Sequence, residues 1–465
     1  KEKTKPKDFA MCVAESKRSF APVLFIAQPL WCIKNNYFLK NMDLRKKIIV
    51  IGGGFAGLEL IKRLGNSKKY DIILVDSNNY NFFAPLIYQV SSGFMEPSAI
   101  SYPFRKILRN FKNVRFRLGS LEKVVPDENK IILNNGELLY DFLIMATGTE
   151  TNYFGNKNIE EKCLPMKTIS DALSLRNTIL TRLDLATRIE NAAERKKYLT
   201  FVIAGAGPTG VELSGIIAEL SGSVIMKDYP ELKEEELGEI YLVDGQKAVL
   251  SSMSLHAQKY AAKKLATYGV HLLMDTFVED FDGESVQLSN GKSIDTKNLI
   301  WAAGVQAKVF EGFHPDSFGQ GKRLKTDQFN KVYLSDNIYA LGDCALIDGD
   351  KNYPDGHPQV AQPAIQQAKN LADNLLKNQE VWKAFGYKDK GSLAIIGRNK
   401  AVLDFPNQKY AMSGFLSWLI WIFVHIMGLV NFKSKLRALY NWLGYYIYKD
   451  QSFRMIIKPN SKKNN

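Results

Sequence analysis

One glycine pattern occurs twice in this sequence, each time between an apolar run and a helical pattern. The first copy, GGGFAG (Gly52–Gly57), follows the run IIVI, and the second, GAGPTG (Gly205–Gly210), follows FVIA. In a Gly-x-Gly-x-x-Gly turn, the first glycine permits a tight bend, the second lets a pyrophosphate approach the backbone, and the third lets the helix pack on the strand. Continuous apolar runs are typical of parallel strands covered on both faces. The sequence therefore predicts an α/β fold with two Rossmann-like dinucleotide-binding domains.

An acidic residue ends the strand pattern that follows each glycine turn. Asp76 closes DIILVD, 19 residues after Gly57, which is close to the spacing of an acid that binds a ribose hydroxyl. Asp244 closes IYLVD, 34 residues after Gly210, and an acidic insertion at 227–239 accounts for the longer interval. We interpret both as ribose contacts. No arginine directly follows Asp244, which favours NADH over NADPH, although the nearby Lys247 leaves the choice open.

Three further apolar runs end in short motifs of the same kind. The run FLIM ends in Ala-Thr-Gly at 146–148, NLIW ends in Ala-Ala-Gly at 302–304, and NIYAL ends in Gly342 and Asp343. The order of the motifs predicts that the second dinucleotide-binding domain is inserted in the first. The predicted boundaries are 46–160 and 306–378 for the first domain, 161–305 for the second, 379–465 for a C-terminal region, and 1–45 for a disordered N-terminal extension.

The net charge of +14 is concentrated at the two ends of the chain. Residues 1–47 hold 11 Lys and Arg against 4 Asp and Glu, and residues 433–465 hold 8 against 1, so the middle of the chain carries no net charge. A nucleic-acid enzyme would carry its basic residues on the folded body, so we expect no nucleic-acid partner. The C-terminal charge adjoins an apolar segment, which favours an anionic membrane surface. Two solvated tails are the alternative interpretation.

The apolar segment runs from Tyr410 to Phe432, 23 residues without a charged side chain. It is long enough to span a bilayer. The segment 433–457 interleaves basic and aromatic residues, a pattern typical of helices that lie at the membrane interface. We predict an amphipathic helical anchor on the membrane surface; a spanning helix and a dimer interface are the alternatives.

The chain has four cysteines, Cys12, Cys32, Cys163 and Cys344, and none lies close to another in sequence. This spacing argues against a disulfide framework and a structural zinc site, and the sequence has no local redox dithiol.

The order of these motifs resembles the two-dinucleotide-domain flavoprotein reductases over residues 46–378. Within that group the chain is most similar to the type II NADH dehydrogenases, through NNYNFFAPLIYQVSSG (78–93), AQPAIQQA (361–368) and GSLAIIGRNKAV (391–402). Disulfide reductases of the group need a cysteine pair, which this sequence lacks. The sequence departs from the family pattern in two places. A glutamate is more usual at the position of Asp244, and the acidic insertion before it is unusually long. Both departures bear on the nucleotide preference and not on the reaction.

The resemblance implies oxidation of NADH and two-electron reduction of a membrane quinone through FAD, without proton pumping and without a metal. It also implies a peripheral membrane protein, on the cytoplasmic face of the inner (plasma) membrane if the source is a bacterium, with a homodimer as an open question. A sulfide:quinone or soluble-acceptor reductase, with Cys163 and Cys344 near the flavin, and a flavin-binding membrane sensor are the alternatives. An intact second glycine turn argues against the sulfide reaction, which does not use NADH.

The resemblance also assigns roles to individual residues. For FAD they are Gly52, Gly54, Phe55, Ala56, Gly57, Asp76, Ala146, Thr147, Gly148, Gly342, Asp343 and Gln362. For NADH they are Gly205, Gly207, Pro208, Thr209, Gly210, Glu212, Asp244, Ala303 and Gly304.

Glu212, Gln362 and Gln366 are the predicted catalytic residues. Glu212 would orient NADH or relay protons, but it could also only complement a helix dipole. Gln362 and Gln366 are four residues apart and share a helix face, and neutral amides can bind a quinone carbonyl without burying a charge. The alternative for both is an ordinary amide-rich helix start. Arg398 and Lys400 lie in a quinone-side motif, and their roles stay open.

Overall fold

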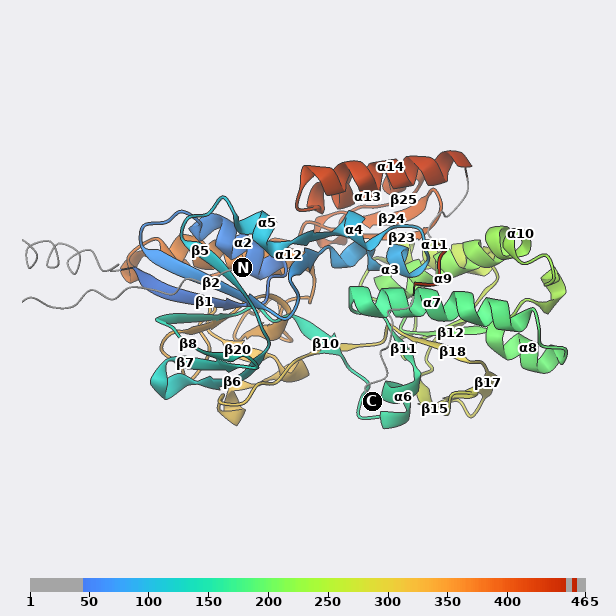
Figure 1. Ribbon diagram of the computed structural model, residues 1–465, viewed down its shortest axis with the longest axis horizontal. Coiled ribbons are helices and arrows are strands. Elements are labelled where there is room, and N and C mark those ends of the chain that lie inside the picture. The colour runs from blue at the N-terminus through green and yellow to red at the C-terminus, as the bar shows by residue number, and fades with distance from the viewer. Residues whose placement is uncertain (1–44, 449–453, 458–465) are drawn as a thin grey trace, which may run out of the picture. The chain divides into compact units, whose positions relative to one another are not determined.

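The computed structural model describes residues 45–448 and 454–457 (Figure 1). The predicted N-terminal extension therefore lies outside the described residues, apart from Arg45.

The first sheet contains five parallel strands in the order β21-β9-β1-β2-β5. The side chains of Ile48, Ile49 and Val50 in its central strand are fully buried, because helices cover one face of the sheet and a small antiparallel sheet covers the other. Helices α2 (Phe55–Leu64) and α12 (Ala361–Leu375) pack against each other on this sheet. The strands are β1 (Lys46–Ile51), β2 (Tyr70–Asp76), β5 (Val114–Leu118), β9 (Phe142–Met145) and β21 (Ile338–Ala340).

The second sheet repeats this design with five parallel strands in the order β11-β18-β12-β13-β14. All five come between β9 and β21 in the chain, so the second sheet interrupts the first in sequence. The predicted α/β fold with two Rossmann-like sheets is confirmed. The strands are β11 (Leu164–Pro165), β12 (Phe201–Ala204), β13 (Ile240–Val243), β14 (Val270–Leu273) and β18 (Asn298–Trp301), and the helices are α7 (Ile169–Ala186), α8 (Ala192–Leu199), α9 (Pro208–Leu220), α10 (Met226–Asp228) and α11 (Leu255–Thr267).

Two antiparallel strands, β10 (Thr149–Thr151) and β19 (Val305–Ala307), connect the two sheets (Figure 1). The two halves also contain shorter elements. They are β3 (Tyr80–Phe82), β4 (Ser101–Pro103), β6 (Leu121–Val125), β7 (Lys130–Leu133), β8 (Gly136–Leu139), β15 (Val278–Phe281), β16 (Ser285–Leu288), β17 (Ser293–Asp295), β20 (Leu324–Thr326), β22 (Ala345–Ile347), α3 (Ile87–Ser91), α4 (Pro97–Ile100), α5 (Phe104–Leu108) and α6 (Lys157–Lys162).

The C-terminal region forms a small antiparallel sheet and two helices. The sheet is β23 (Ser392–Gly397), β24 (Lys400–Asp404) and β25 (Ala411–Gly414), and the helices are α13 (Phe415–Gly428) and α14 (Phe432–Tyr448). The charge-free segment is therefore divided between a strand and a helix of 14 residues. Among the described residues no helix has the length and apolar character to cross a membrane.

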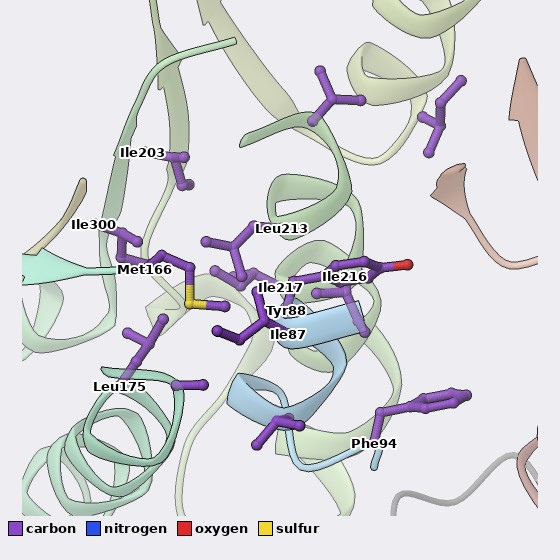
Figure 2. Close-up of a cluster of buried hydrophobic side chains, with 14 of the residues drawn as sticks. Ile87, Tyr88, Phe94, Met166, Leu175, Ile203, Leu213, Ile216, Ile217 and Ile300 are labelled. Atoms are coloured by element: carbon purple, nitrogen blue, oxygen red, sulfur yellow. The ribbon is translucent and has the colours of Figure 1, made fainter. Parts of the chain in front are cut away.

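A single cluster of buried apolar side chains joins the two dinucleotide-binding halves to the C-terminal region. Figure 2 shows Ile87 and Tyr88 of α3 next to Leu213, Ile216 and Ile217 of α9. Other members come from β23 and β24 and from the two C-terminal helices, among them Trp421 and Trp442. This cluster sets the relative positions of α3, α9 and β23, which matter for the site below.

Gly215 of α9 allows the closest of these approaches. A Cβ atom at Gly215 would lie 1.8 Å from the backbone oxygen of Ile396 in β23. Because the clashing atom belongs to the backbone, rotation of a side chain could not relieve the clash. We expect Gly215→Ala to lower the free energy of unfolding by about 2 kcal/mol or more, because α9 and β23 would have to separate. Chemical denaturation measures this change.

Gly222→Ala is the matched control, because a Cβ at Gly222 would meet nothing within 4 Å. If Gly215→Ala lowers the free energy of unfolding by less than roughly 0.5 kcal/mol, α9 and β23 can move apart at little energetic cost.

Candidate active site

The first glycine of each turn is required by the protein's own backbone. Gly52 and Gly205 have φ angles of +100° and +102°, a conformation that side chains disfavour. A Cβ at Gly52 would lie 2.3 Å from the backbone oxygen of Ala146, and one at Gly205 would lie 2.6 Å from that of Ala302. Each turn therefore contacts the loop after the neighbouring strand, which brings Thr147 and Gly148 to one turn and Ala303 and Gly304 to the other.

The second glycine of each turn faces open space. A Cβ at Gly54 or at Gly207 would meet nothing within 4 Å, so no protein contact requires glycine there. Both residues are N-caps, of α2 and α9, and neither helix start has a side-chain cap. The free N–H groups of such a helix start attract anions. Both turns therefore fit a pyrophosphate, with Phe55 and Ala56, or Pro208 and Thr209, in the first helical turn, as predicted.

The two predicted ribose acids occupy equivalent positions. The Asp76 carboxylate accepts hydrogen bonds from the N–H groups of Gly53 (2.7 Å) and Asn78 (2.8 Å). The Asp244 carboxylate accepts them from Ala206 (2.5 Å) and Gln246 (2.7 Å). Burial raises the pKa of Asp76, and the backbone N–H groups oppose that shift. Each acid is thus fixed at the edge of its glycine turn, where the ribose of a bound dinucleotide would lie.

Gly342 and Asp343 lie in a 3₁₀ turn, η7 (Gly342–Cys344), directly after β21. The Gly342 N–H donates to the side chain of Gln367 (2.7 Å), and the Gln359 side chain donates to the Asp343 carbonyl (2.9 Å). Helix α12 and the segment before it therefore hold this turn in place. Neither Gln359 nor Gln367 was predicted as a site residue, although Gln367 lies within AQPAIQQA (361–368) and Gln359 lies two residues before it.

The Asp343 carboxyl group is partly buried near two basic side chains. Burial raises its pKa, and the charges of Lys167 and Arg323 oppose the shift. The Lys167 ammonium group donates to the Thr149 hydroxyl (2.6 Å), and burial lowers its pKa. Lys167 therefore lies near Asp343. It lies outside every motif, so only the structure identifies it.

Gln362 and Gln366 share one face of α12, as predicted, and both contact the loop that precedes β23. The Gln362 side chain donates to Gly391 O (2.8 Å) and accepts from Lys390 N (3.0 Å). The Gln366 side chain donates to Lys388 O (2.9 Å) and accepts from Lys388 N (3.0 Å). In this structure both amides fix the loop, and their predicted contact with a quinone stays a prediction.

A cavity lies between α3, α9, β23, α13 and α14. Aromatic side chains, including Tyr88, Trp418 and Trp442, form much of its wall, and Glu212 and Glu219 bring two carboxyl groups to it. Glu219 accepts a hydrogen bond from the backbone N–H of Arg398 (2.6 Å), and Arg398 also lines the cavity. Neither Gln362 nor Gln366 is among the lining residues. The structure therefore brings Glu212 and Arg398 to the same cavity. It places the two glutamines outside the lining of that cavity.

Glu212 is the strongly perturbed acid of this cavity. Its side chain is 8% exposed, and the backbone N–H of Ile395 in β23 is 3.4 Å from its carboxylate. Burial raises its pKa to about 8, against smaller opposing effects from Ile395 and the Trp421 indole. A carboxyl group that holds its proton near neutral pH can act as a general acid. The dipole alternative does not explain why this carboxyl group is buried in an aromatic cavity.

The two described cysteines, Cys163 and Cys344, are buried and unpaired. Burial raises the pKa of Cys163 to about 12 and also raises that of Cys344. Because the thiolate is the nucleophile, thiols with raised pKa values are poor nucleophiles. This argues against the sulfide alternative.

Comparison with known proteins places the chain in a family. Residues 46–368 match the family described as pyridine nucleotide-disulphide oxidoreductase, and residues 390–449 match the NDH2 C-terminal domain. Two relatives from Mycobacterium tuberculosis are named type II NADH:quinone oxidoreductase. One, Ndh, is 33% identical over 86% of this chain and 87% of its own length, and the other, NdhA, is 32% identical over 86% of each.

Solved structures show the same fold. NDH2 from Plasmodium falciparum, in complex with NADH, superposes with a TM-score of 0.80 at 24% identity and covers 89% of this chain and 100% of that one. The sulfide:quinone oxidoreductase from Aquifex aeolicus gives a TM-score of 0.67 at 17% identity, over 87% and 96%. From both matched domains and the curated relatives, the predicted resemblance is confirmed: the chain belongs to the pyridine nucleotide-disulphide oxidoreductases and, within them, to the type II NADH:quinone oxidoreductases.

Proposed function

We propose that this protein oxidises NADH and reduces a membrane quinone through FAD, without pumping protons. One observation carries the proposal: the two sheets present two equivalent dinucleotide cradles, each with an open second glycine and an acid fixed on the turn. One cradle suits the resident cofactor and the other suits the electron donor. Names of the relatives support NADH as the donor and a quinone as the acceptor.

FAD and NADH are the cofactors that these cradles fit. The turn at Gly52–Gly57, Asp76, the loop at Ala146–Gly148 and the turn at Gly342–Asp343 would hold FAD, which accepts a hydride and passes on electrons when bound. The turn at Gly205–Gly210, with Asp244, would hold NADH. No thiol nucleophile is required by this assignment.

The aromatic cavity is the proposed quinone side of the site. Its wall is mostly apolar, and the carboxyl group of Glu212 supplies a proton within it. Reduction of a quinone to a quinol takes up two protons, so a protonated acid at the cavity would deliver one of them at its carboxyl oxygen. Arg398 would orient this region through its backbone bond to Glu219.

Gln362 and Gln366 are proposed to act on the same side through the loop 388–391. Their amides hold the backbone that leads into β23, and Ile395 of β23 lines the cavity beside Glu212. Direct contact with a quinone carbonyl would require either amide to leave its loop partner. Lys400 lies 5.7 Å from the ring of Tyr268, outside the cavity lining, and we assign it no catalytic role.

Helices α13 and α14 are the proposed membrane contact. Basic residues Lys433, Lys435 and Arg437 on α14 complement anionic lipid, while Trp421 and Trp442 face inward. This arrangement supports peripheral association, on the cytoplasmic face of the inner membrane if the source is a bacterium. The same face could pair two copies of the chain. The exposed apolar residues are Phe415, Leu416, Leu419, Phe423, Val424, Met427, Phe432, Leu436, Leu439, Tyr440 and Leu443.

Anaerobic stopped-flow absorbance tests both half-reactions. We expect NADH to bleach the flavin band of the FAD-loaded protein and a short-chain quinone to restore it, because one flavin serves both substrates. If NADH fails to bleach the flavin, the second glycine turn does not bind a productive donor, and sulfide is the next donor to test. If NADH bleaches the flavin but quinone restores it only slowly, the protein is a sensor or uses a soluble acceptor.

The pH dependence of the quinone half-reaction tests Glu212. We expect the rate to fall as pH rises through about 8, because the carboxyl group loses the proton that it donates. Glu212→Gln should lower the rate by about a hundredfold and remove this inflection. Glu219→Gln is the matched control in the same cavity and should keep the inflection, whatever its effect on the rate.

Stability gives an independent measure of the same group. The unfolded carboxyl ionises near 4.5 and the folded one near 8, so the unfolded state binds fewer protons between these values. Folding stability should therefore decrease as pH rises from 4.5 to 8, and Glu212→Gln should remove that contribution. A variant that keeps the kinetic inflection but loses the stability effect would assign the kinetic pKa to another group.

A further inference from the structure

The position of each ribose acid indicates where the other end of each bound dinucleotide would lie. In an open α/β sheet a dinucleotide spans the carboxyl ends of the strands, with its adenosine half at the acid and its pyrophosphate at the glycine turn. Asp76 ends β2, so the flavin half of FAD would extend to the opposite side of β1, over β9 and β21. Asp244 follows β13, so the nicotinamide half of NADH would extend over β18 and β11.

Lys167 lies where these two ends meet. In sequence it comes two residues after β11, at the nicotinamide end of the second sheet. Its ammonium group reaches the flavin end of the first sheet, where it donates to the hydroxyl of Thr149 (2.6 Å), the first residue of β10. Thr149 directly follows the loop Ala146–Gly148 after β9. One side chain therefore connects the loops at which the flavin and the nicotinamide would meet.

The backbone of Lys167 is fixed at the start of α7. Its N–H group donates to the Asp171 carboxylate (3.1 Å), which also accepts from the N–H group of Thr168 (2.8 Å). Thr168 is the N-cap of α7 and forms a capping box with Asp171. The lysine side chain therefore extends towards Thr149 from a fixed point of the second sheet.

The Lys167 ammonium group has more donors than the described protein uses. An ammonium group has three donors, and among the described residues its hydrogen-bond partner is the neutral hydroxyl of Thr149. The Asp343 carboxyl group attracts it at longer range. Arg323, the other cation near Asp343, donates to backbone carbonyl groups at positions 320, 355 and 357. Of these two cations, Lys167 is therefore the one whose charge is available to a ligand.

The ammonium group also borders open space. Lys167 and Thr149 both line a cavity of about 510 Å³ at the connection between β10 and β19, and Gln306 and Lys322 line it as well. A cavity of this size can admit part of a cofactor-sized ligand. The spare donors of Lys167 therefore have room for a partner other than protein.

We propose that Lys167 contacts the flavin end of bound FAD and stabilises the negative charge that the flavin gains on reduction. The inference rests on the proposed function, because it takes the first cradle as the FAD site. Charge beside a flavin ring tunes how readily the ring accepts electrons, and a partly buried charge acts more strongly than an exposed one. Lys167 thus raises the reduction potential of the bound flavin. A lysine that only joined the two sheets would leave this potential unchanged.

Reductive titration of the FAD-loaded full chain, with dithionite and a reference dye, tests the role of Lys167. We expect Lys167→Met to lower the ratio of reduced to oxidised flavin at a fixed potential about tenfold, which is about 30 mV in a two-electron potential. Lys167→Arg should keep a potential close to that of the wild type, because it keeps the charge. Lys322→Met is the matched control, because it removes an exposed lysine of the same cavity, and it should leave the ratio unchanged.

An unchanged potential in Lys167→Met would overturn the proposal and leave Lys167 as a structural contact between the two sheets. An equal shift in Lys322→Met would also overturn it, because the effect would then come from net charge and not from contact. If Lys167→Met loses FAD on purification, separate titrations with oxidised and reduced FAD give the same shift, because the ratio of the two affinities sets the potential of the bound cofactor.

This measurement separates the role of Lys167 from the proposed function. Dithionite reduces flavin without NADH or quinone, so a chain that binds FAD but does not oxidise NADH still shows whether Lys167 sets the potential. A chain that binds no FAD has no flavin band, and in that case both the proposed function and the role of Lys167 are wrong.

Discussion

Contact between each glycine turn and the end of the neighbouring strand is the constraint on which the rest of the structure depends. Gly52 lies against Ala146, and Gly205 lies against Ala302, at distances that no side chain allows. These contacts draw the loops after β9 and β18 to the carboxyl edge of each sheet. The crevice at that edge is where open α/β sheets bind their ligands. The same backbone contact therefore builds the turn, places the neighbouring motif and leaves the second glycine open to a pyrophosphate.

The proposed quinone side depends on a different kind of contact, between parts of the chain that are distant in sequence. Glu212 follows the second glycine turn, Tyr88 belongs to α3, and Ile395 and the tryptophans come from the C-terminal region. Gly215 lets α9 approach β23, and that approach encloses Glu212 in an apolar wall. The raised pKa of Glu212 is thus a consequence of how three regions pack, because none of them alone would bury it.

Local patterns were sufficient to predict the two cradles. Gly54, Gly207, Asp76 and Asp244 lie where the motif places them, since strand, turn and helix follow each other directly in the chain. The C-terminal stretch was harder, because 23 uncharged residues carry no local signal that Gly414 ends a strand before α13 begins.

Residues that act through non-local contacts could not be predicted in this way. The spacing of Gln362 and Gln366 correctly indicated a shared helix face but not the loop that they contact. Lys167 and Arg176 lie in no motif. Only folding sets their surroundings, namely Thr149 and Asp343 for Lys167 and apolar side chains of α7 and α9 for Arg176.

Glu212 and Arg176 show the same physical principle with opposite charge. Each is an ionisable side chain that apolar neighbours enclose, and each therefore destabilises the folded protein in its charged form. Glu212 can avoid this cost by holding a proton, and that proton is what a quinone reductase needs at its acceptor side. Arginine cannot give up its proton in this way, so the Arg176 guanidinium group stays charged and its Nε and Nη2 donors need a hydrogen-bond acceptor. Burial among apolar neighbours therefore has different consequences for the two side chains: Glu212 holds a proton near neutral pH, whereas Arg176 stays charged.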